Sequence, residues 1–92
     1  MSKSDWTPMR RLHAAGRLAV CDAKEVQGYW RGWMVWVQVD EETDDWYIRV
    51  TDPRGCYAYD GWWAESSNKT AADAVAEAFR GACLLDLVEE RT

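Results

Sequence analysis

The sequence predicts an α+β fold with a three- or four-stranded antiparallel β-meander, a short N-terminal helix and a C-terminal amphipathic helix packed on the sheet. From Tyr29 onward the side chains divide between two faces with the two-residue period of a strand: one face has Trp33, Val35, Val37 and Val39, and the other has Met34, Trp36 and Gln38. Clusters of turn-forming residues separate the alternating runs. From Ala71 the apolar residues recur with helical spacing instead. The 92 residues, 1–92, are few enough to form one domain.

The first elements predicted are a short helix over residues 8–15 and a strand over 17–23. Pro8 suits the first position of a helix, and Gly16 is a typical residue at a helix end. The segment 17–23 alternates loosely between apolar and polar residues, which favours a strand, although the same residues also fit a further turn of helix.

Two strands of the meander are predicted over residues 30–40 and 45–52. Both are rich in β-branched and aromatic residues, and the acidic run DEETDD joins them as a hairpin tip. The residues Asp52-Pro53-Arg54-Gly55 predict a turn, after which residues 56–60 return as a third strand. The residues expected to face the C-terminal helix are Trp33, Val35, Val37, Ile48 and Val50.

The C-terminal helix is predicted over residues 71–87. Thr70 with Asp73 three residues later is a capping arrangement that marks its start. Gly81 weakens a helix by about 1 kcal/mol relative to alanine, so we expect a close backbone approach to a strand there. The predicted apolar stripe comprises Ala72, Val75, Ala76, Phe79, Ala82 and Cys83.

Acidic residues outnumber basic ones by sixteen to eleven, which gives a net charge of −5. Proteins that bind nucleic acid directly present a basic face to the phosphates, so direct binding is not expected. The charge is also uneven, because residues 1–36 hold six bases and three acids whereas residues 37–92 hold five bases and thirteen acids. The acidic half favours a basic protein partner, including one that handles nucleic acid.

Cysteine and histidine usage argues against metal sites and disulfides. Three cysteines at spacings of 35 and 27 residues, with one histidine, form no metal-binding pair and no complete disulfide framework. Cys21, Cys56 and Cys83 have apolar neighbours, which predicts that they pack in the core. Unpaired thiols suit a reducing cytoplasm. We expect no membrane span and no export signal, because no apolar run is long enough.

The hairpin tip is the first candidate binding site. It carries five carboxylates within six residues, namely Asp40, Glu41, Glu42, Asp44 and Asp45. One interpretation is a solvated turn that also discourages edge-to-edge aggregation. Another is a mimic of a phosphate backbone that occupies a groove built for nucleic acid. Calcium is a weaker alternative, because a calcium loop needs a glycine at its sixth position and none is present.

The aromatic residues of the strands are the second candidate site. Alternation predicts that Trp36, Tyr47 and one of Tyr57 and Tyr59 share the face away from the helix as an aromatic ladder. Such pairs stabilise a sheet by up to about 1 kcal/mol each, which is one explanation for them. The other is an interface, either a homodimer or a partner site, built from Trp36, Tyr47 and Arg49. Stacking of a sugar or a base is a further alternative.

Adjacent tryptophans follow the third strand. In an extended segment Trp62 and Trp63 point to opposite faces, so one of them leaves the core. Packing against the N-terminal residues or contact with a partner would each explain the outward ring.

No set of residues predicts catalysis. His13 has no serine or cysteine at a recognisable spacing, and acid and base triples such as Tyr57, Asp60 and Glu65 occur in any acidic protein. We therefore expect a protein that is not an enzyme and that uses no cofactor and no metal.

The helix TAADAVAEAFRGACL after an antiparallel meander resembles small phage-encoded α+β proteins. Small size, acidity and the lack of a catalytic set are also similar to anti-CRISPR proteins and toxin-immunity proteins. That resemblance implies inhibition by tight binding, often through acidic side chains that occupy a nucleic-acid channel. Those groups share no motif, so charge alone nominates the tip. The hypotheses are therefore an inhibitor of phage or mobile-element type, a toxin-immunity protein, or a structural protein that self-associates through its aromatic face.

Overall fold

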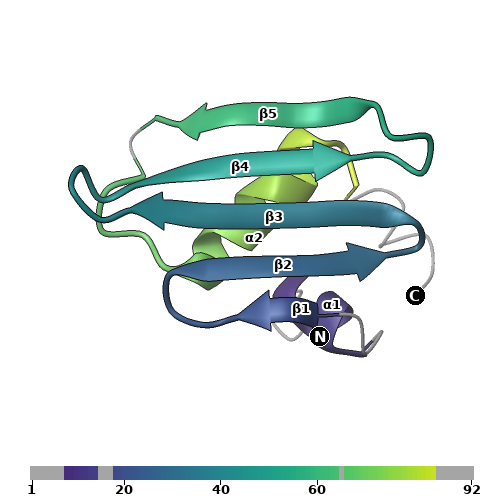
Figure 1. Cartoon of the computed structure of the whole chain (residues 1–92), viewed down its shortest axis with the longest axis horizontal. Coiled ribbons are helices and arrows are strands. Elements are labelled where there is room, and N and C mark those ends of the chain that lie inside the picture. Colours follow the sequence, from purple (N-terminus) through teal and green to yellow (C-terminus); the bar gives the residue numbers. More distant parts are fainter. Residues whose placement is uncertain (1–7, 15–17, 65, 85–92) are drawn as a thin grey trace, which may run out of the picture.

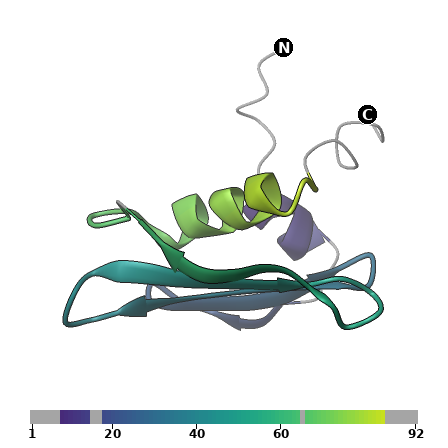
Figure 2. The same cartoon turned by 90° about the horizontal axis from the view of Figure 1, so that it is seen from above.

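The computed structural model describes residues 8–14, 18–64 and 66–84, which fold into a five-stranded antiparallel sheet with two helices. The strands follow one another in chain order as a meander (Figure 1). Both helices lie on the same side of the sheet, as the view from above shows (Figure 2). The elements are α1 (Pro8–Ala14), β1 (Leu18–Cys21), β2 (Glu25–Trp30), β3 (Trp33–Asp40), β4 (Asp45–Thr51), β5 (Tyr57–Trp63) and α2 (Ala71–Gly81). The predicted α+β class is confirmed, with more strands than predicted.

The additional strand is β2, and the predicted strand over 30–40 is wrong at its start. The chain reverses at Arg31 and Gly32, whose φ angles are 54° and 86°. Two successive residues with positive φ form the tight turn that matches the twist of a β-hairpin. Arginine is unusual in that conformation, so the apolar alternation on both sides conceals the turn and suggests one continuous strand.

The observed boundaries of β1 and α1 also differ from the predicted ones. The strand predicted over 17–23 is confirmed as β1, which ends at Cys21 because the Asp22 side chain accepts hydrogen bonds from the backbone N–H groups of Lys24 and Glu25. Helix α1 covers 8–14 of the predicted 8–15, and residues 15–17 lie outside the described residues.

The third predicted strand, 56–60, corresponds to β5 at Tyr57–Trp63. Cys56 instead belongs to the preceding turn, where its N–H donates to the Asp52 side chain at 2.9 Å. The strand continues through Trp62 and Trp63, which point to opposite faces as predicted. Trp63 packs against the core, whereas Trp62 is 58% exposed.

Helix α2 starts as predicted, with a capping box in which Thr70 and Asp73 each accept the other's backbone N–H. It ends at Gly81, so the predicted helix is wrong at residues 82–84, where Cys83 has a positive φ of 61° and the chain turns away from the helix. Positions 85–87 of the predicted helix lie outside the described residues. The buried face of α2 is rotated about the helix axis relative to the predicted apolar stripe. Val75 and Phe79 are buried, but Ala72 and Ala76 are exposed. The alanines buried against the sheet are Ala71, Ala74 and Ala78.

The core lies between α2 and the central strands. Val35, Val37, Ile48 and Val50 are fully buried, and Trp33 packs beside them, as predicted. Helix α1 contributes Leu12 to the same core. Since both helices cover one face, the opposite face of the sheet keeps its own set of side chains for solvent or a partner.

The prediction that the cysteines pack in the core is wrong. Cys21, Cys56 and Cys83 are all exposed and carry free thiols. Cys21 is the last residue of β1, Cys56 lies in the turn just before β5, and Cys83 lies two residues after the end of α2. Apolar sequence neighbours therefore do not bury a residue when the backbone turns away from the core at that point.

Candidate functional site

The sheet face opposite the helices carries a row of aromatic side chains across three strands. Tyr47 on β4 lies between Trp36 on β3 and Trp62 on β5. Its ring centroid is 5.7 Å from that of Trp36 and 5.2 Å from that of Trp62, and both pairs meet edge to face. The expected ladder of Trp36 and Tyr47 is therefore present. Trp62 is not part of the predicted ladder. It lies opposite Tyr47, and it shares this face with Tyr57, five residues away, because the register of β4 and β5 shifts between Val50 and Thr51.

Arg49 is built into this open face. Its guanidinium carbon lies 5.4 Å from the ring centroid of Trp36, 5.6 Å from that of Tyr47 and 5.3 Å from that of Tyr57. Tyr57, and not Tyr59, is thus the tyrosine of β5 that shares this face. The Arg49 Nε atom is also 3.5 Å from a carboxylate oxygen of Asp60 on the adjacent strand. The hydrogen bond that Arg49 donates to the Tyr47 hydroxyl raises the pKa of the guanidinium.

The tip of the β3–β4 hairpin is organised by its own carboxylates. Asp40 accepts from the Glu42 N–H at 2.9 Å, which closes the turn. Asp45 accepts from the Ser67 hydroxyl at 3.1 Å, and Asp44 accepts from a backbone N–H of the same loop. Asp44 also has a φ of 66°, which an aspartate tolerates better than most residues. The predicted solvated turn is therefore also a structural clamp on the loop before α2.

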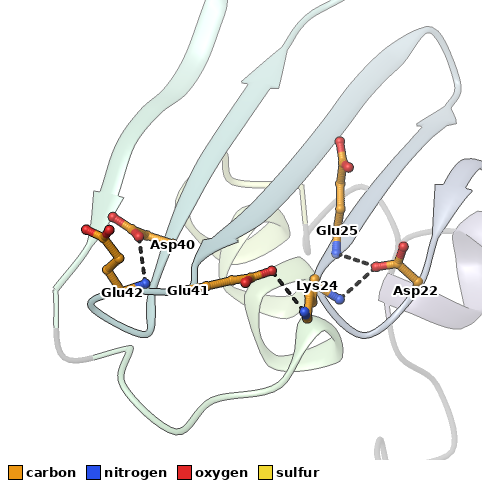
Figure 3. A network of polar contacts seen from close by, with 6 residues as sticks. All are labelled: Asp22, Lys24, Glu25, Asp40, Glu41 and Glu42. Carbon is orange, nitrogen blue, oxygen red and sulfur yellow. Dashed lines mark hydrogen bonds and ion pairs between the residues drawn. The ribbon is translucent and has the colours of Figure 1, made fainter.

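Lys24 on the β1–β2 turn pairs with the tip. Its Nζ atom lies 2.9 Å from a carboxylate oxygen of Glu41, and both side chains are 66% exposed. The hydrogen bond to Glu41 raises the pKa of Lys24. Figure 3 shows Glu41 directed toward Lys24 and Glu42 directed away from it. Because this contact joins residues of different turns, the sequence did not reveal it.

Glu25 is a further acidic residue of the open face that sequence reasoning missed. Its carboxylate accepts a hydrogen bond of 2.7 Å from the indole nitrogen of Trp36, and Glu25 lies opposite Gln38 in the register of β2 and β3. The hydrogen bond fixes the outer edge of the Trp36 ring. It also places a negative charge beside the aromatic row.

A shallow depression of about 450 Å³ joins the aromatic row to the tip. It therefore brings five of the eight predicted binding residues, Asp40, Glu41, Trp36, Tyr47 and Arg49, onto one surface. Glu42, Asp44 and Asp45 do not line it. The full set of lining residues is Trp36, Gln38, Val39, Asp40, Glu41, Tyr47, Arg49 and Trp62, which we call the open-face depression.

Metal sites, membrane-spanning helices and similarity to known proteins are the remaining features that bear on function. In residues 8–14, 18–64 and 66–84, no group of three or more histidine, cysteine or acidic side chains is placed to hold a metal ion. No helix in the same part of the chain is long and apolar enough to cross a membrane. Comparison of the chain with protein-family models, with curated proteins and with solved structures found no match.

Proposed function

We propose that this chain is a small non-enzymatic inhibitor that binds a partner protein through its open face and covers a basic, nucleic-acid-binding site on that partner. The observation that supports it most is the open-face depression, where the exposed ring of Trp62, the half-buried rings of Trp36 and Tyr47 and two carboxylates line one surface. Tryptophan, tyrosine and arginine dominate the binding energy of protein interfaces, and Trp36, Tyr47 and Arg49 supply all three types here.

Charge supports a basic partner. The chain carries a net charge of −5, and Asp40, Glu41, Glu25 and Asp60 surround the aromatic row. A negative rim accelerates association with a basic surface, and it repels the phosphates that this surface would otherwise bind. Because such charges are exposed, the association should weaken as salt rises.

The biological role that fits is an intracellular inhibitor of the anti-CRISPR or toxin-immunity type, encoded by a phage or another mobile element. Small size, acidity and an α+β meander are the features that support this role. Both types of inhibitor need tight binding to a partner protein and no catalysed reaction, and an open sheet face offers a surface for such binding.

Affinity capture from the lysate of a host cell tests the proposal. The purified chain is used as bait with nuclease present, at low and at high salt, and retained proteins are identified by mass spectrometry. We expect a nucleic-acid-handling protein that is retained at low salt and released at high salt. Capture that survives only without nuclease would contradict the proposal, since nucleic acid would then be the bridge.

Three variants locate the binding surface. Glu41→Lys changes a residue of the depression, whereas Glu42→Lys makes the same charge change at an adjacent residue that does not line it. Trp62→Ser removes a ring that is 58% exposed, and we expect affinity to fall about tenfold or more, as for an interface hot spot. Equal effects of the two lysine variants, with no effect of Trp62→Ser, would exclude this face.

Self-association is the second candidate function, and one observation favours it. The two large hydrophobic residues that are most exposed in the described chain, Tyr57 at 60% and Trp62 at 58%, both lie on the edge strand β5. Sedimentation over a range of concentrations separates the two functions. A dimer that Trp36→Ala disrupts would support self-association through the aromatic face, and a monomer at all concentrations would exclude it.

A further inference from the structure

We infer that the open-face depression is a receptor for a lysine or arginine side chain of the partner protein. The inference rests on the proposed function and specifies its anchoring contact. The depression suits a cation because its lining combines the rings of Trp36, Tyr47 and Trp62 with carboxylates at one end.

The register of the strands sets the shape of the depression. Gln38 lies directly opposite Tyr47, which in turn lies opposite Trp62. Trp36 and Asp40 stand two residues to either side of Gln38, so alternation places them on the same face. The exposed Gln38 side chain is therefore bordered by rings on two sides and by a carboxylate on the third.

Arg49 shows that this aromatic row already accepts a cation. Its guanidinium lies within 5.6 Å of the ring centroids of Trp36 and Tyr47, at the end of the row farther from the tip. Asp60 is its partner carboxylate there. At the opposite end, Asp40 lines the depression together with Glu41, which is paired with Lys24, and the Asp40 carboxylate offsets repulsion between Arg49 and a second cation.

The shape of a long cationic side chain suits these features. Its aliphatic stem would lie over Tyr47 between Trp36 and Trp62, and its charged end would reach Asp40. Such a side chain combines apolar burial along the stem with attraction between a cation and the ring faces. A phosphate or a nucleobase next to phosphate would meet the carboxylates of Asp40 and Glu41 instead, and these repel it.

The test uses nuclear magnetic resonance with short peptides as probes. The probe is a capped glycine peptide that carries lysines, and its matched control is the same peptide with every lysine acetylated. A third peptide carries arginine in place of lysine, and a single-stranded oligonucleotide serves as the competing ligand class. We expect both cationic peptides to shift the indole resonances of Trp36 and Trp62 and the side-chain amide of Gln38, whereas the acetylated peptide and the oligonucleotide do not.

A matched pair of protein variants places the binding site. Gln38→Lys fills the depression with the chain's own ammonium group, whereas Gln27→Lys adds the same charge on the same face of the adjacent strand, outside the depression. We expect Gln38→Lys to abolish the shifts at Trp36 and Trp62, and Gln27→Lys to weaken binding no more than about twofold, as expected for one added surface charge. Circular dichroism verifies that both variants are folded.

The outcomes separate this inference from the proposed function. Equal binding of the acetylated peptide, shifts caused by the oligonucleotide, or equal loss in both lysine variants would each overturn the cation receptor. If one of these results occurs but the Trp62→Ser variant still fails to capture the partner protein, the proposed inhibitor function is supported and only the cation receptor is excluded. If cationic peptides bind the depression but no open-face variant alters partner capture, the proposed function fails instead.

Discussion

Gly81 at the end of α2 lies directly against the ring of Tyr59 on β5, so close that a side chain at position 81 would overlap the ring. The close approach to a strand that was predicted at this glycine is present, but the helix backbone there meets the side-chain ring of Tyr59 and not the strand backbone. Tyr59 is held in place by the hydrogen bond that its hydroxyl donates to Glu77 at 3.0 Å. The contact therefore fixes where α2 crosses the edge strand.

Gly81→Ala should destabilise the fold. Overpacking a close contact typically costs about 1–3 kcal/mol, which exceeds the helix propensity gained at a terminal position. We expect the free energy of unfolding, measured by chemical denaturation, to fall by about 1–2 kcal/mol. Gly61→Ala is the matched control, because an added Cβ at Gly61 meets nothing within 4 Å. If the Gly81→Ala protein were as stable as the parent, the Tyr59 ring would be able to move aside without a loss of stability, contrary to this prediction.

Ser66→Ala should destabilise the loop before α2. Ser66 is fully buried, and its hydroxyl oxygen accepts the backbone N–H of Trp46 at 2.8 Å. Loss of the acceptor leaves a buried donor unsatisfied, which costs about 1–3 kcal/mol. Ser67→Ala removes a hydroxyl from an exposed hydrogen bond to Asp45 and serves as the control, with a smaller expected loss. Equal losses in the two variants would contradict the role assigned to burial.

Acid should weaken the fold through α2. The hydrogen bond from the Thr70 N–H lowers the pKa of Asp73 below 3.8, and the Arg80 guanidinium lowers that of Glu77 below 4.5. A carboxyl whose pKa is lower in the folded state adds stability above its unfolded pKa and loses it as pH falls through the folded value. Stability should therefore decline below about pH 4, and Asp73→Asn with Glu77→Gln should flatten the decline. An unchanged pH profile in that double variant would refute the assignment.

Alkali should act through Tyr59. Burial, followed by the hydrogen bond to Glu77, raises the pKa of Tyr59 from 10.0 to about 12. A group whose pKa is raised in the folded state contributes fully below its unfolded pKa, so the loss begins near pH 10.0 and continues through about 12. Titration of tyrosinate by ultraviolet absorbance should show one late-titrating tyrosine, which Tyr59→Phe removes. Persistence of that late step in the variant would assign it to another residue.

The thiols of the folded chain should react readily. Cys21, Cys56 and Cys83 are all exposed, so a colorimetric disulfide reagent should modify all three without denaturant. The number of thiols that react in the folded protein is compared with the number that react after addition of denaturant. Fewer reactive thiols in the folded protein would favour the burial that the sequence predicted and would contradict the structure.

Much of the fold could be predicted because its signals are local. The alternation in β3 and β4 and the capping pair Thr70 and Asp73 each depend on residues within a few positions of one another. The turn at Arg31 and Gly32 escaped prediction because an arginine with positive φ carries no common turn signal. The number of strands was therefore underpredicted, although the class was correct.

The sequence by itself determined the acidic charge, the α+β class and the membership of Trp36 and Tyr47 in one face, because composition and two-residue alternation need no knowledge of long-range contacts. Only the tertiary structure decided that Trp62 completes the aromatic row and that Lys24 pairs with the tip. Only the tertiary structure, too, placed Asp40 and Glu41 in the same depression as the rings. These relationships follow from strand register and from the meeting of separate turns, which depend on how distant segments pack and not on their local pattern.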